Sequence, residues 1–137
     1  MAQPVRVTRE VWNTLVAQAR LEPSVECCGL LAGRGGVITT VLPAGNALAS
    51  ATAYEIAAAE LFELFRRMRR LTLEHMGIYH SHPASENAPS PRDIAAAYYP
   101  DAAYFILSPA EDAARPVRAF SIREGRTEEL EIRVVES

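Results

Sequence analysis

Two histidines and an aspartate in the middle of this sequence have the side chains that zinc binds. His80 and His82 are separated by one residue, and Asp93 follows a short polar segment. Side chains alternate along a strand, so histidines at positions i and i+2 point to the same face. Catalytic zinc sites commonly have three such protein ligands and leave a fourth position for water, whereas structural sites close it. The pattern predicts a catalytic Zn²⁺ site with His80, His82 and Asp93 as metal ligands.

Hydrolysis also needs a group that moves protons, and Glu26 is the candidate. Zinc lowers the pKa of bound water from about 15.7 towards about 7, so a nearby carboxylate can take its proton and pass it to a leaving amine. Glu26 stands just before a predicted strand that begins at Cys28 and that could lie beside the strand of the two histidines. Glu22 is a nearby competitor for this role.

Helices and strands are expected on both sides of these residues. Helical spacing of apolar residues, strand-like runs, and glycine or proline between them divide the chain. In order, we expect helix 9–20, a hairpin over 28–42, a loop over 43–52, helix 57–71, strand 76–82, a short helix from 91, and strands 104–108, 117–123 and 129–135. The start of the second helix is open, because Thr52 and Glu55 match a capping box while Tyr54 and Ile56 could form a short extended piece.

The short helix after the histidines has a clear predicted start. Ser90 is a suitable N-cap, Pro91 suits the first helical position, and Pro100 lies shortly beyond the end. This start places Asp93 in the first turn. Serine and aspartate at this spacing are also what a plain capping box uses, and both roles can coexist because a carboxylate has two oxygens.

Length and composition favour one compact domain over residues 1–137. The chain has 49% apolar and 23% charged residues, enough apolar surface for one core. Its net charge is −3, and the only basic cluster, at Arg66–Arg70, is interpreted as a solvated helix face. We therefore expect no nucleic-acid partner.

A cytoplasmic protein without a membrane partner is expected from the same sequence. No apolar run approaches the roughly 20 residues needed to cross a bilayer, and the first residues lack the layout of a secretory signal. Cys27 and Cys28 are neighbours, so they cannot close a loop as a disulfide. They are expected to be free thiols in a reducing compartment, with Cys28 packing as a small apolar residue.

The combined motif resembles that of a known family. His80-x-His82, seven residues, Ser90, two residues and Asp93, with Glu26 upstream of Cys28-Gly29, is similar to the complete motif of the JAMM metalloprotease family, also called MPN-plus. The chain looks like a short prokaryotic member. The resemblance implies an α+β fold, the α/β cytidine-deaminase-like MPN domain, with a mixed, mostly antiparallel sheet flanked by helices.

The resemblance also implies a role for each motif residue. His80, His82 and Asp93 would be zinc ligands, and Glu26 would be general base and acid. Ser90 would stabilise the oxyanion of the tetrahedral intermediate, a contribution that can be worth about 3 kcal/mol.

The substrate class follows from the same family. Its members cut peptide or isopeptide bonds after the C-terminal glycines of ubiquitin and ubiquitin-like proteins, and bacterial relatives act on small sulfur-carrier proteins. Residues 83–89 form a short loop without room for large insertions, which favours a small ubiquitin-like substrate. We expect cleavage after the Gly-Gly tail of such a carrier, and the thin tail could add as a strand beside the site.

Three other interpretations stay open. The two histidines could be structural residues of a half-buried strand. The family also contains metal-free scaffold members, so the chain could be an interaction module, although it keeps the whole ligand set. A third interpretation is general processing of peptides or ubiquitin-like conjugates.

Overall fold

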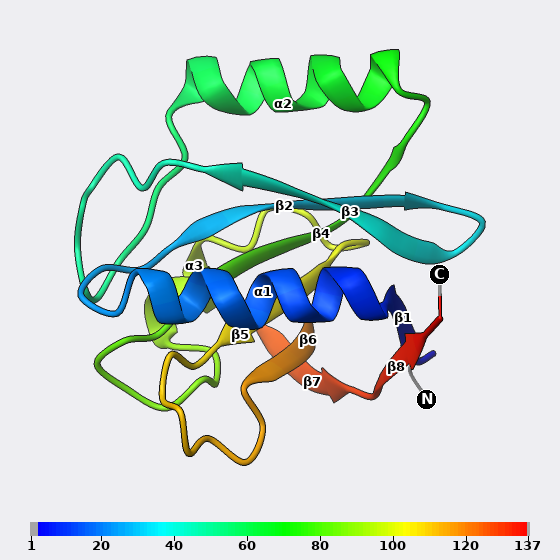
Figure 1. Cartoon of the computed structure of the whole chain (residues 1–137). Helices are drawn as coiled ribbons and strands as arrows, with labels where there is room; N and C mark the ends of the chain where they lie inside the picture. Colours follow the sequence, from blue (N-terminus) through cyan, green and yellow to red (C-terminus); the bar gives the residue numbers. More distant parts are fainter. Residues whose placement is uncertain (1–2, 137) are drawn as a thin grey trace.

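The computed structural model describes residues 3–136, which form a mixed eight-stranded sheet with helices on both faces (Figure 1). The spatial order of strands is β7-β6-β5-β4-β2-β3-β1-β8. Four strand pairs are antiparallel and three are parallel, which confirms the predicted α+β class with a mixed, mostly antiparallel sheet. The elements are β1 (Val5–Thr8), α1 (Arg9–Leu21), β2 (Cys28–Arg34), β3 (Val37–Ala44), α2 (Ala58–Arg70), β4 (Glu74–Ser81), α3 (Pro91–Ala95), β5 (Ala103–Leu107), β6 (Val117–Arg123), β7 (Arg126–Leu130) and β8 (Ile132–Val135).

The central strands are buried on both faces because α1 covers one side of the sheet and α2 the other (Figure 1). Neighbouring residues of a strand alternate between the two cores. Leu30 and Ile78 pack on the α2 side, whereas Leu31 and Tyr79 pack on the α1 side. Burial of both faces explains why these strands are almost continuously apolar in sequence.

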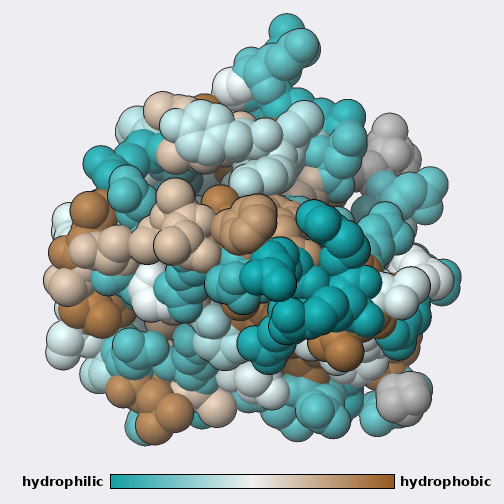
Figure 2. All heavy atoms as spheres, turned by 90° about the horizontal axis from the view of Figure 1, so that it is seen from above, coloured by the Kyte–Doolittle hydropathy of each residue, from teal (hydrophilic) through white to brown (hydrophobic). Residues whose placement is uncertain are grey.

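Both long helices agree with the sequence prediction to within about one residue. Thr8 caps α1 by accepting a hydrogen bond from the backbone N–H of Val11 at 3.2 Å. The capping box suggested before α2 is wrong, since the N-cap is Ala57 and no side chain caps it. Arg66, Arg67, Arg69 and Arg70 are exposed, as predicted. Figure 2 looks down on α2 and shows hydrophilic side chains gathered over part of the helix with apolar ones beside them.

The predicted hairpin is confirmed as β2 and β3, which pair antiparallel. Its turn contains Gly35 and Gly36, with φ of 61° and 77°. Two successive positive φ angles suit the turn types that match the twist of a hairpin and that favour glycine.

The two ends of the described chain differ from the prediction. β1 was not expected, because four residues directly before a helix carry little periodic signal. The strand expected at 129–135 is instead broken at Glu131 into the end of β7 and β8. β7 pairs with β6, whereas β8 pairs with β1 at the opposite end of the sheet order. The break is needed because successive residues must join two different edges of a curled sheet.

Membrane insertion was not expected, and within residues 3–136 the helices are too short or too polar to cross a bilayer.

Candidate metal centre

The two histidines lie at the carboxyl end of β4, and both are buried. β4 is paired on both sides at this point: His80 is opposite Cys28 of β2 and Ile106 of β5. The backbone N–H of His82 donates to Leu107 at 2.9 Å. An added substrate strand, as the sequence suggested, therefore finds no free edge on β4 and would have to pair with another segment.

α3 brings Asp93 to the histidines. Ser90 Oγ accepts from the backbone N–H of Asp93 at 3.1 Å, and Asp93 Oδ2 accepts from the backbone N–H of Ser90 at 2.9 Å. The predicted capping box is thus confirmed, with Pro91 at the first helical position. The helix ends at Ala95. The box fixes the Asp93 carboxylate in the first turn, where both oxygens face the end of β4.

Three potential ligand atoms meet at one point. The Nε2 atoms of His80 and His82 lie 3.1 Å apart. Asp93 Oδ1 lies 3.2 Å from His80 Nε2, and Oδ2 lies 3.0 Å from His82 Nε2. Ligand atoms about 2.0–2.1 Å from a tetrahedral zinc ion would be roughly 3.3–3.4 Å apart. The spacing and the donor types therefore fit a zinc ion, which would need only slight adjustment of these side chains.

Glu26 reaches the same point from the start of β2. Ligand atoms of Glu26, His80 and His82 all lie within 4.8 Å of one another. The two Asp93 oxygens lie 3.2 and 3.0 Å from the imidazole nitrogens, close to the spacing of zinc ligands, which favours Asp93 as third ligand with Glu26 beside the centre. The alternative base, Glu22, is exposed.

The environment of Glu26 favours its protonated form. The side chain is buried, and its Oε1 has no hydrogen-bond partner within residues 3–136. Burial raises the pKa of Glu26 to about 7, and the positive charge of His82 opposes this rise. A carboxyl group with a pKa near neutrality can both accept and donate a proton.

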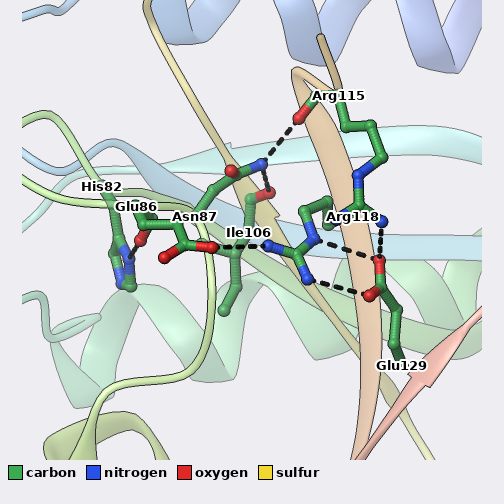
Figure 3. Close-up of polar contacts among 7 residues, drawn as sticks. All are labelled: His82, Glu86, Asn87, Ile106, Arg115, Arg118 and Glu129. Carbon is green, nitrogen blue, oxygen red and sulfur yellow. Dashed lines mark hydrogen bonds and ion pairs between the residues drawn. The ribbon is translucent and has the colours of Figure 1, made fainter. Parts of the chain in front are cut away.

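A hydrogen bond orients His82. Its Nδ1 lies 2.8 Å from the backbone carbonyl of Glu86, which can only accept (Figure 3). Nδ1 is therefore the donor, so the Nε2 of the neutral ring keeps its lone pair for a metal ion. Burial opposes protonation of this ring, but the hydrogen bonds that the protonated ring donates to Asp93 and Glu86 raise the pKa of His82 overall.

His80 is held by packing instead. Its Nδ1 is buried without a hydrogen-bond partner among the described residues. The ring of Tyr54 stacks on it, with centroids 4.4 Å apart and planes inclined by 19°. Burial lowers the pKa of His80. A neutral imidazole is the form that binds zinc.

The loop that carries the Glu86 carbonyl is anchored by Asn87. This side chain is buried, and its Nδ2 donates to the carbonyls of Arg115 at 2.9 Å and Ile106 at 3.3 Å (Figure 3). Asn87 was not predicted from the sequence, because an asparagine in a polar loop carries no sign of burial.

Two further arginines extend these contacts towards β7. Arg118 lies 3.4 Å from the Glu86 carboxylate and 2.8 Å from that of Glu129 (Figure 3). Arg115 lies 2.9 Å from Glu129. The outer end of the loop is thereby tied to the edge of the sheet.

A second asparagine, Asn46, organises the loop on the other side of the site. Its Nδ2 donates to the backbone carbonyls of Glu26 at 3.0 Å and Ala53 at 2.9 Å, while its Oδ1 accepts from the N–H of Glu55 at 3.2 Å. These bonds place Tyr54 over His80. The sequence predicted only a loop here.

The cysteines behave as expected. Cys27 and Cys28 are buried free thiols, and burial raises the pKa of Cys28 to about 12. The Cys28 thiol lies 3.7 Å from the carbonyl of Ala44 and is therefore protonated and packed.

Comparison with known proteins agrees with the motif. Residues 8–123 match the family described as prokaryotic homologs of the JAB domain. The chain is 33% identical over 132 residues to the CysO-cysteine peptidase of Mycobacterium tuberculosis, covering 95% of this chain and 90% of the relative. It is 34% identical over 91 residues to the desampylase of Haloferax volcanii, covering 64% of this chain and 66% of that protein.

Solved structures share the fold. A protein from Desulfitobacterium hafniense superposes with a TM-score of 0.83 at 31% identity, covering 96% of this chain and 93% of that one. A JAB1/MPN domain protein from Archaeoglobus fulgidus superposes with a TM-score of 0.61 at 17% identity, covering 96% and 99%. The second likeness concerns the fold alone.

Proposed function

Because the chain belongs to the prokaryotic JAB-domain branch of the JAMM (MPN-plus) family, we propose that it is a zinc-dependent metallopeptidase. Its substrate is the tail of a sulfur-carrier or other ubiquitin-like protein, cut at the amide or isopeptide bond after the C-terminal Gly-Gly. The proposal rests chiefly on the meeting of His80, His82 and Asp93 at distances of 3.0–3.2 Å, with buried Glu26 beside them.

His80, His82 and Asp93 are the residues that would hold the zinc ion. Two imidazole nitrogens and one carboxylate oxygen are a donor set that zinc accepts in catalytic sites. When bound, zinc supplies Lewis-acid chemistry that polarises a carbonyl oxygen and lowers the pKa of water. The carbonyl of Glu86 and the ring of Tyr54 keep the two imidazoles aimed at that point.

Glu26 acts as general base and then as general acid. Its pKa of about 7 lets the carboxylate take a proton near neutral pH and give it to the leaving amine. Ser90 stabilises the oxyanion. Its oxygen already accepts the Asp93 N–H, so its own O–H remains available as a donor.

The favoured leaving group is a cysteine or short extension on a sulfur carrier. The M. tuberculosis peptidase supports this choice, because the similarity spans 95% of the chain. The desampylase match spans 64% and supports the second candidate, cleavage of ubiquitin-like conjugates. Residues 1–137 would act as one domain in the cytoplasm, without nucleic-acid or membrane partners.

Incubation with two substrate types tests the proposal. The zinc-loaded protein is mixed with a Gly-Gly-tailed carrier bearing a C-terminal cysteine and, separately, with a lysine-linked conjugate of the same carrier. Mass spectrometry should detect shortening of the first substrate, and Glu26→Gln should abolish it while retaining zinc. Cleavage of the conjugate alone would replace the first candidate by the second. Absence of zinc binding even with added metal would favour a scaffold.

A further inference from the structure

A cavity opens beside the candidate metal centre, between the segment before α2 and α3. Its volume is about 420 Å³. It reaches Asp93 and Tyr54 at the metal centre, and Ile56, Leu61 and Tyr99 line it elsewhere. A substrate group in this cavity would therefore lie next to the proposed zinc ligands.

Arg92 is the one lining residue with a permanent positive charge. The side chain is exposed, and within residues 3–136 no carboxylate forms an ion pair with it, whereas Arg66 and Arg118 have such partners. Arg92 thus lines the cavity without a fixed partner among the described residues.

The surroundings of Arg92 are otherwise acidic. Asp93 and Glu55 line the same cavity, and Glu26 lies beside the metal centre. An anionic substrate group would be repelled by these carboxylates unless a cation received it. Arginine suits that role, because its planar fork binds a carboxylate through two parallel hydrogen bonds.

The two candidate substrates differ in whether a carboxylate lies next to the scissile bond. When the leaving group is one C-terminal amino acid, its carboxylate and the scissile nitrogen are attached to the same α-carbon. In a lysine-linked conjugate the scissile nitrogen ends a long aliphatic side chain, with no carboxylate nearby. A cation close to the scissile bond therefore distinguishes the two.

We propose that Arg92 binds the terminal carboxylate of a single-residue leaving group and so selects a carrier–amino acid substrate over a lysine-linked conjugate. This inference rests on the proposed peptidase function and names its specificity residue. Arg92 is accessible on α3, and its replacement leaves the Ser90–Asp93 capping box intact.

Peptide binding tests the inference without requiring turnover. The probes are acetyl-Gly-Gly-Ala with a free carboxylate and the same peptide as its C-terminal amide. Alanine replaces cysteine so that no thiol binds the metal. Dissociation constants are measured by titration calorimetry on zinc-loaded Glu26→Gln, alone and combined with Arg92→Gln, Arg92→Lys or Arg123→Gln. The control residue is Arg123, which is exposed at the last position of β6 and ion-paired with Asp101.

The acid should bind about tenfold more tightly than the amide, as expected for hydrogen bonds between charged groups. Arg92→Gln should remove this preference without weakening amide binding, Arg92→Lys should retain part of it, and Arg123→Gln should retain all. A preference that survives Arg92→Gln, or no preference in the parent, overturns the inference. An Arg92-dependent preference in a protein whose wild type cleaves neither carrier substrate would instead contradict the peptidase function alone.

Discussion

His80 lies in β4 and His82 directly follows the last residue of that strand, yet the protein holds the two rings in different ways. His82 donates Nδ1–H to the Glu86 carbonyl, on a loop that Asn87 ties to β5 and to the following loop. His80 has no such bond, and its ring lies between the core and Tyr54. One imidazole is therefore directed by hydrogen bonds and the other by packing.

This difference predicts which distant substitutions should alter zinc binding by each imidazole. A hydrogen bond fixes both tautomer and direction, so a displaced Glu86 carbonyl changes what His82 Nε2 presents. A stacked ring fixes orientation but leaves the tautomer free. Zinc affinity should therefore depend more strongly on the Glu86 loop than on Tyr54.

Removal of either imidazole should have the largest effect on zinc affinity. The effect should be similar for both histidines, although they are held in different ways. His80→Ala and His82→Ala should each weaken zinc binding by more than the roughly ten- to hundredfold typical of an outer partner. Competition with a chromogenic chelator measures this affinity. Excess chelator should lower the thermal midpoint of the wild type but not of the variants, because only a protein that binds zinc is stabilised by it. A variant with wild-type affinity would exclude that histidine as a ligand.

Loss of the loop anchor should be the next largest effect. Asn87→Ala removes the side-chain donor to the carbonyls of Ile106 and Arg115 and should cost about 1–3 kcal/mol of unfolding free energy. It should also weaken zinc binding about tenfold through the displaced Glu86 carbonyl. Urea unfolding and chelator competition measure the two. Asn13→Ala, an exposed change on α1, is the matched control, and equal zinc affinities in the two variants would contradict a role for the anchor.

Loss of the stacked ring should have a smaller effect. Tyr54→Leu should weaken zinc binding several-fold, since an aromatic pair contributes about 0.5–1.5 kcal/mol beyond its buried area. Tyr54→Phe keeps the ring and should bind zinc like the wild type. If Tyr54→Phe weakens zinc binding as much as Tyr54→Leu, the phenol oxygen rather than the ring stack supports zinc binding.

The smallest effect is expected for the Glu86 side chain. Glu86→Ala removes an exposed ion pair to Arg118 but keeps the backbone carbonyl that His82 contacts. Exposed ion pairs contribute little, so zinc affinity should stay within about twofold of the wild type. A loss as large as that of Asn87→Ala would mean that the side chain, rather than the main chain, controls the loop.

The sequence predicted the residues that gather at the site better than it predicted the groups that hold them. One strand end, one loop and one helix start contain His80, His82, Ser90 and Asp93. Local rules therefore suffice to place these residues near one another. The identity of Glu26 rested on a family resemblance, because its approach depends on the pairing of β2 with β4.

Asn46, Asn87 and Tyr54 could not be predicted, because each acts across the fold. Asn87 contacts carbonyls 19 and 28 residues away, and Tyr54 stacks on a ring of another element. The break at Glu131 was missed for the same reason. A run of alternating apolar and polar residues has the same pattern whether it forms one strand or two strands that pair with different partners.

The pairing of β1 with β8 has a consequence for how the protein is made. β1 ends at Thr8 and its partner β8 ends at Val135, so nearly the whole described chain must leave the ribosome before they meet. Contacts between residues so far apart in sequence form late and slow folding. A nascent chain can form the β2–β3 hairpin early, but β1 can pair fully with β8 only after residue 135 has been added. Ribosome-bound chains stalled just before β8 should therefore remain protease-sensitive at their amino-terminal strand.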